Sequence, residues 1–215
     1  MDEFVFLSVF TWQLRKGWDI LLRAYFEEFS EKDGVSLMLR CDPFRYGGGN
    51  LDDSIRRDIE ESRRKFGGEN PPALKLLTDH IGNRELVDLY ASSDAFVLPS
   101  RGEGWSRPVM EAMALGVPVI TTGWGGQTEF AEAESVRLLE YNIVPVSRAA
   151  EREYGLFAGH RWAEPSLAHL RREMRAALNL GKGFRDRQSA AKILASFDHL
   201  RIAEDILDLL AFPAG

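Results

Sequence analysis

The sequence predicts an α/β protein built on a single doubly wound parallel sheet. Short apolar runs rich in β-branched and aromatic residues alternate with longer segments in which apolar residues recur every three or four positions. Parallel strands need helical crossovers, so this alternation favours a parallel sheet with helices on both faces. The expected strands are residues 4–10, 35–40, 74–78, 95–98, 117–121 and 135–139.

Helices are expected between these strands and throughout the C-terminal part of the chain. In the first one, Ile20, Leu21 and Ala24 form an apolar face. Ser166 is a candidate N-cap for a later helix, and residues 162–165 lead into that helix. Residues 141–160 lose all periodicity, which predicts a long irregular connection. The expected helices are residues 18–29, 53–65, 84–92, 109–115, 166–178, 188–196 and 200–210.

The domain organisation follows from this order of elements. Residues 1–165 are expected to form the sheet domain, and residues 166–215 to add extra C-terminal helices that pack on it. The chain has 215 residues, of which 45% are hydrophobic, and is long enough to bury a core. The last helices should also expose some apolar surface, so self-association is a further expectation.

Composition excludes several classes of function. A net charge of −6 argues against a nucleic-acid partner, because phosphate-backbone binding needs clustered cations. No apolar run is long enough for a transmembrane segment, and the first residues lack the basic start of a secretory signal. The single cysteine, Cys41, predicts neither a disulfide framework nor a metal site. We therefore expect a cytoplasmic protein.

The stretch from Ser100 to Glu111 is the expected functional centre. It reads SRGEGWSRPVME and joins a buried strand to a short helix that opens with Pro108 and stops at Gly116. Such a junction lies at the carboxyl ends of parallel strands, where a helix N-terminus offers N–H groups to a phosphate. The carboxylates of Glu103 and Glu111 do not suit a phosphate and point instead to sugar hydroxyls.

Two other loops should meet this stretch at the same edge of the sheet. The first strand is followed by the basic turn Arg15-Lys16-Gly17, and the fifth strand by the glycine-rich turn at residues 123–129. Small residues such as Gly125 and Gly126 let the backbone approach a ligand closely. Three converging loops of this kind predict a site for a phosphorylated ligand.

The central stretch resembles the nucleotide-sugar signature of GT-B glycosyltransferases, the large retaining family called family 4 or group 1. Its two glutamates are separated by seven residues, as in that family, and the Pro108 helix and the segment Gly116-Val-Pro-Val match its consensus line. The resemblance covers essentially the whole chain and implies the C-terminal half of a GT-B fold, with a Rossmann-like sheet. It also implies that the N-terminal half is supplied elsewhere, in the same chain or in another one.

The family resemblance implies a role for each matching residue. Glu103 would contact the donor sugar, Glu111 the ribose hydroxyls, and Lys16 the diphosphate. Arg15 would assist Lys16, because Thr11 stands where the family usually has an arginine. The N–H groups near Ser106 and Arg107 would offset charge on the leaving group. The remaining implied binding positions are Gly104, Ile81 near the base, Gly125 and Gly126.

The implied activity is transfer of a glycosyl group with retention, from a UDP-, GDP- or ADP-sugar to an acceptor, with no metal ion and no further cofactor. Two alternatives stay open: a catalytically silent nucleotide-binding or interaction module, and a GT-B sugar-nucleotide epimerase. Simpler explanations of the residues also remain. Glu103 could be a solvated loop acid and Glu111 a first-turn acid favoured by the helix dipole, while the basic and glycine-rich turns could be ordinary surface turns. The base, the sugar and the acceptor cannot be read from the sequence.

Overall fold

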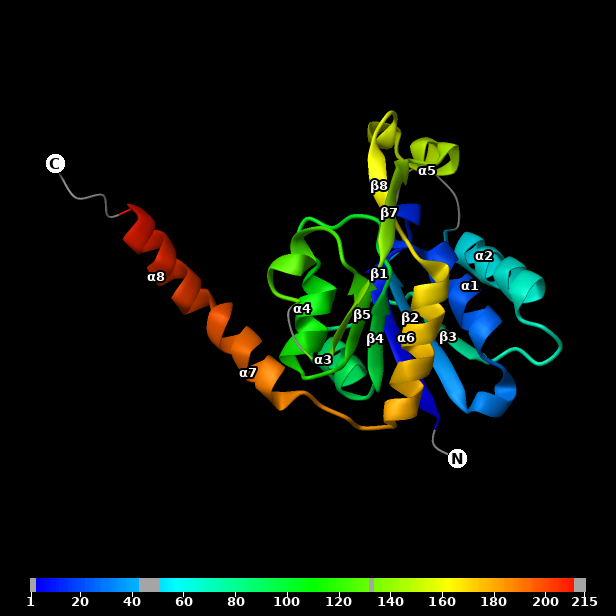
Figure 1. Ribbon diagram of the computed structural model, residues 1–215, viewed down its shortest axis with the longest axis horizontal. Coiled ribbons are helices and arrows are strands. Elements are labelled where there is room, and N and C mark those ends of the chain that lie inside the picture. Colours follow the sequence, from blue (N-terminus) through cyan, green and yellow to red (C-terminus); the bar gives the residue numbers. More distant parts are fainter. Residues whose placement is uncertain (1–2, 43–50, 132–133, 211–215) are drawn as a thin grey trace.

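The computed structural model describes residues 3–42, 51–131 and 134–210, and its centre is a six-stranded parallel sheet (Figure 1). The strands lie in the order β3-β2-β1-β4-β5-β6. This order reverses between β1 and β4, which is the arrangement of a Rossmann-like sheet and confirms the predicted fold class. The strands are β1 (Phe4–Thr11), β2 (Val35–Asp42), β3 (Ala73–Leu77), β4 (Ala95–Leu98), β5 (Val119–Thr122) and β6 (Val136–Leu139).

Helices cover both faces of the sheet. On one face α1 packs against α2 and α6, and on the other α4 packs against α7, with α3 beside it (Figure 1). The crossover through α3 leads from β3 back to β4, so the chain changes face there. The helices are α1 (Trp18–Glu28), α2 (Leu51–Phe66), α3 (Asn83–Ala91), α4 (Arg107–Ala114), α6 (Leu167–Leu180) and α7 (Arg187–Ser196).

The core explains why the central strands read as unbroken apolar runs. Phe6 and Leu7 of β1 and Phe96 and Val97 of β4 are all fully buried, since helices cover the sheet on both sides. Burial of one such side chain stabilises the fold by roughly 1.5–3 kcal/mol. The expected apolar face of α1 is confirmed, as Ile20, Leu21 and Ala24 are buried.

The prediction for residues 141–160 was wrong. They contain β7 (Tyr141–Pro145), the short helix α5 (Arg148–Glu153) and the 3₁₀ turn η4 (Gly155–Phe157). Residues 162–165, expected only to introduce a helix, belong to β8 (Arg161–Pro165), which pairs antiparallel with β7. We call residues 141–165 the ribbon, and Figure 1 shows it standing above the carboxyl ends of the sheet strands. Its strands are short and β7 is largely exposed, so they carry little periodicity.

Two other loops contain local structure that the sequence did not predict. The turn after β1 includes the 3₁₀ turn η1 (Leu14–Lys16). The turn after β5 leads into the 3₁₀ turn η3 (Gly126–Glu129) rather than into an α-helix. The predicted cap of α6 is confirmed, because the Ser166 hydroxyl accepts a hydrogen bond from the N–H of His169.

The C-terminal helices differ in how they pack. Helix α6 lies along α1, and α7 lies against α4, whereas α8 (His199–Leu210) continues beyond α7 away from the body of the molecule (Figure 1). Leu200 and Ile206 of α8 are 64% and 50% exposed, so this helix presents apolar surface. Within the described residues, no helix combines the length and the apolar character needed to span a bilayer.

Candidate functional site

The candidate site lies at the carboxyl edge of the sheet, where the loops after β1, β4 and β5 meet. They pack backbone against backbone: a Cβ added to Gly17 would lie 2.1 Å from the carbonyl oxygen of Pro99. A Cβ added to Gly126 would lie 1.8 Å from that of Gly104. The Gly126 N–H also donates to the Glu103 carbonyl at 3.0 Å. The three predicted loops are therefore brought together.

A buried ion pair joins the first two loops. The Nζ of Lys16 lies 2.7 and 2.8 Å from the carboxylate oxygens of Glu103, and the two side chains are only 12% and 6% exposed. Arg15 donates to the Gly102 carbonyl and has its Nη1 3.5 Å from Glu103. Burial lowers the pKa of Lys16, and the charge and hydrogen bond of Glu103 offset part of that effect. Glu103 is thus not a solvated loop acid.

Glu111 lies beyond the first turn of α4, on the side facing α3. Its carboxylate accepts a hydrogen bond from the Tyr90 hydroxyl at 3.0 Å and lies 3.5 Å from the Arg107 guanidinium. Burial raises the pKa of Tyr90, and Glu111 raises it further. No acidic residue lies in the first turn of α4, so the explanation of Glu111 as a first-turn acid is wrong. Its side chain stays one-third exposed and open to a ligand.

The start of α4 has an unusual backbone. Ser106 is the N-cap residue with φ at 65°, a left-handed conformation that a non-glycine residue rarely adopts. Its side chain is buried, and its hydroxyl has no hydrogen-bond partner among the described residues. Gly104 is exposed, and the Arg107 side chain is 84% exposed. Helix α4 therefore begins with an unpaired hydroxyl and an exposed cation, which lies near Glu111.

One predicted site residue lies apart from the others. Ile81 follows β3, which is separated from β4 by β2 and β1. At about 4.8 Å per strand, that places the two strand ends about 14 Å apart. The loop that carries Ile81 therefore starts at a different part of this edge from the loop that carries Glu103.

Arg101 was not identified from the sequence, although it is the most connected side chain of the site. It is 5% exposed and lies between Asp19 of α1 and Glu164 of β8. Its guanidinium also lies 4.8 Å above the Trp162 ring. Asp19 and Glu164 are separated from Arg101 by 82 and 63 residues, so no local sequence pattern could have revealed the cluster.

No group of three or more potential metal ligands comes together among the described residues.

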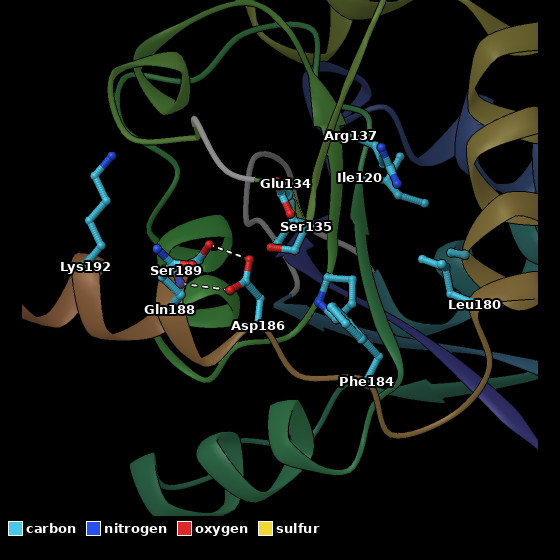
Figure 2. A pocket seen from close by; sticks show the side chains of 13 residues that line it. Ile120, Glu134, Ser135, Arg137, Leu180, Phe184, Asp186, Gln188, Ser189 and Lys192 are labelled. Carbon is cyan, nitrogen blue, oxygen red and sulfur yellow. Dashed lines mark hydrogen bonds between the residues drawn. The ribbon is translucent and has the colours of Figure 1, made fainter.

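A separate pocket of about 730 Å³ lies at the starts of β5 and β6, lined by residues that include Ile120, Arg137 and Phe184 (Figure 2). It shares no residue with the candidate site, because the starts of parallel strands lie at the opposite edge of the sheet.

Comparisons with known proteins identify the family and the fold of the chain. Residues 2–146 match the family model described as "Glycosyl transferases group 1". Mannosylfructose-phosphate synthase of Agrobacterium fabrum is 30% identical over 119 residues, which are 52% of this chain and 23% of that protein. The UDP-forming α,α-trehalose-phosphate synthase of Burkholderia vietnamiensis is similar in structure, with a TM-score of 0.66, 12% identity, and coverage of 98% of this chain and 46% of that one.

A second solved structure, Anabaena Alr3699/HepE in complex with UDP-glucose, has a TM-score of 0.60 and 18% identity, with coverage of 98% of this chain and 49% of that one. At these identities the structural likeness shows the fold, which is that of GT-B glycosyltransferases. The chain spans less than half the length of the proteins that it matches here. Because the family model covers well over half of the sequence, the chain belongs to the glycosyl transferases group 1 family.

Proposed function

We propose that this chain is the C-terminal, donor-binding domain of a family 4 retaining glycosyltransferase. Residues 1–165 would bind a nucleotide-diphosphate sugar. Of residues 166–215, expected to pack on the same domain, α6 and α7 do so, whereas α8 does not (Figure 1). The acceptor would be held by an N-terminal domain in the same or another chain. A cytoplasmic location is part of the proposal and rests on the single buried cysteine, Cys41.

The observation that carries the proposal is the pairing of Lys16 with Glu103 beside the start of α4. A nucleoside diphosphate would compete with Glu103 for the Lys16 ammonium and release the carboxylate toward the sugar hydroxyls. Arg15, 29% exposed, could turn to the same phosphates. Charge-assisted hydrogen bonds of this kind are about twice as strong as neutral ones.

The other predicted residues extend this arrangement. The unpaired Ser106 hydroxyl and the first N–H groups of α4, near Arg107, suit a phosphate. Glu111 would accept from the ribose hydroxyls, as its carboxylate has spare acceptor capacity. Gly104 would leave room for the ligand, and Ile81 would line the base. Gly125 and Gly126 make room for the backbone of Glu103 and Gly104 and would serve the site by holding that loop in place. Cations and N–H groups would then stabilise the leaving diphosphate, which is usually the largest contribution to catalysis.

The direct test is calorimetric titration with the pairs UDP and uridine, GDP and guanosine, and ADP and adenosine. The wild type should bind one diphosphate more tightly than its nucleoside. Lys16→Ala should weaken diphosphate binding by roughly 1.5–3 kcal/mol, or about 10- to 150-fold, and leave nucleoside binding nearly unchanged. Lys32→Ala, an exposed lysine at the amino edge, is the control. Equal weakening of diphosphate and nucleoside by Lys16→Ala would reject the phosphate role.

Transfer itself is tested with a radiolabelled nucleotide sugar, with and without a separately expressed N-terminal domain. The isolated chain should transfer no sugar, because orientation of the acceptor contributes about 7–11 kcal/mol. Robust transfer by this chain alone would place the acceptor site within its own residues and contradict the division of labour proposed here.

A further inference from the structure

Arg101 uses its whole guanidinium to join three segments of the chain. Its Nη1 donates to the Leu14 carbonyl at 2.5 Å and to Asp19 at 2.6 Å. Its Nη2 donates to Asp19 at 2.9 Å and to Glu164 at 2.7 Å, and its Nε to Glu164 at 2.6 Å. An arginine has five N–H donors, and all of them are engaged here. The side chain is therefore held in one orientation.

The main chain of Arg101 is tied to the same segments. Its N–H donates to the Arg15 carbonyl at 2.7 Å, and its carbonyl accepts from the N–H of Ala163 at 3.1 Å. The carbonyls of Leu14 and Arg15 are thus both fixed by Arg101, immediately before Lys16. Arg101 itself stands two residues before Glu103. One residue therefore sets the position of both members of the ion pair.

We propose that Arg101 is a positioning residue, which aligns Lys16 and Glu103 for the donor diphosphate by locking the loops after β1 and β4 to the ribbon. This inference rests on the proposed function of the Lys16–Glu103 pair. Arg101 would not touch the ligand, because it is almost fully buried beneath the loop that carries Lys16.

The ribbon contributes more than one contact to this lock. Glu164 pairs with the guanidinium, and Trp162 covers its face. From α5, the Glu153 carboxylate accepts the N–H of Leu14 at 2.9 and 3.2 Å. The turn before Lys16 is thus held from the ribbon on one side and from Arg101 on the other. The ribbon would therefore hold the turn before Lys16 and the Arg101 side chain in place beside the donor site.

Arg101→Lys is the sharpest variant, because lysine keeps the charge but cannot form paired hydrogen bonds with two carboxylates. It should weaken binding of UDP, GDP or ADP, whichever binds the wild type best, by roughly ten- to a hundredfold. This is the effect expected when Lys16 and Glu103 are displaced from their aligned positions. Affinity for the matching nucleoside should stay within about twofold, since in the proposed site Lys16 would contact only the phosphates. Glu164→Gln, a milder change, should act in the same direction and less strongly.

The matched control is Arg175→Lys. Arg175 forms a similar cluster, with Glu28 and Asp33, and its guanidinium lies 4.5 Å above the Phe29 ring. That cluster joins α6 to the end of α1, at the opposite edge of the sheet. Its loss should lower the melting temperature and leave the ratio of diphosphate to nucleoside affinity unchanged.

Hydrogen exchange gives a readout that does not depend on any ligand. In Arg101→Lys, exchange should accelerate at the N–H groups of Lys16 and Gly17, which are bonded within the loop, and not in β1. Wild-type exchange at these N–H groups, or unchanged diphosphate affinity in Arg101→Lys, would overturn the positioning role and leave the proposed function standing. Absence of diphosphate binding by the wild type would instead overturn the proposed function, and this inference with it.

Discussion

The two ends of β4 differ in how the buried polar groups beside them are paired. At its amino end, Asp94 is 6% exposed and accepts backbone N–H groups from Val5 at 2.8 Å and Gly183 at 3.0 Å. At its carboxyl end, the hydroxyls of Ser100 and Ser106 are buried without a partner among the described residues. At the amino end of β4 the buried carboxylate is paired within the fold, while beyond its carboxyl end two buried hydroxyls have no partner among the described residues.

The contrast is specific to β4, since Ser36 near the start of β2 also has an unpaired hydroxyl and Arg101 at the carboxyl edge is fully paired. At the amino edge, Asp33 closes a capping box with Ser30, and Asp186 caps α7 through Ser189 (Figure 2). Unpaired buried groups normally cost about 1–3 kcal/mol each. The comparison teaches that Asp94 uses its acceptors for the fold, while the unpaired hydroxyls beyond the carboxyl end of β4 remain available to the ligand proposed above.

The largest expected effect comes from filling the close approach at the carboxyl edge. Gly126→Ala should lower the free energy of unfolding by about 3 kcal/mol or more, because the new methyl would overlap the Gly104 carbonyl, which is backbone and cannot rotate away. At the amino edge, the methyl group added by Gly34→Ala has no atom within 4 Å. This variant should lose only the roughly 1–2 kcal/mol of stability that a positive φ costs a residue other than glycine. Urea denaturation of both variants measures the difference, and equal losses would contradict the close packing of these loops.

Asp94→Asn should separate stability from binding. The amide can accept only one of the two N–H groups and presents its own NH₂ to the other, which should cost about 1–3 kcal/mol of stability. Diphosphate affinity, measured by calorimetry below the melting temperature, should not change. A loss of affinity without a loss of stability would show that the two edges are not separable in this way.

Glu111→Gln is the corresponding change at the carboxyl edge. It should weaken binding of a ribonucleoside diphosphate by about 1 kcal/mol, because a neutral amide accepts hydrogen bonds more weakly than a carboxylate. The 2′-deoxy ligand, which already lacks one donor, should lose less. Similar losses for both ligands in parallel titrations would exclude Glu111 from the ribose site.

Ser106→Gly should have the smallest effect, and of opposite sign. Glycine adopts the positive φ of this position freely, so stability should rise by about 1 kcal/mol. Ser106→Ala removes the same hydroxyl but keeps the strained backbone, so it should be less stable than Ser106→Gly. Both variants should bind the diphosphate more weakly. That result would show that Ser106 lowers the stability of the fold but contributes to ligand binding. Unchanged affinity in both variants would mean that the hydroxyl serves no ligand.

The sequence alone determined the sheet, its flanking helices and the meeting of three loops at its carboxyl edge. These follow from periodicity, from turn residues and from the rule that parallel strands end together, all of which are local or topological. It also identified Glu103, through its spacing from Glu111 within one loop and helix, and Lys16, through the basic turn before Gly17.

Only the tertiary structure decided how these residues are held. The ribbon was missed because β7 is largely exposed and its packing is set by contacts with other segments, such as Glu153 with Leu14. Arg101 was missed because its two carboxylates lie 82 and 63 residues away. Its charge does not specify its partners; the fold does, by bringing α1, β4 and β8 to one point. The left-handed backbone of Ser106 has the same origin, since neighbouring loops impose a conformation that serine alone would avoid.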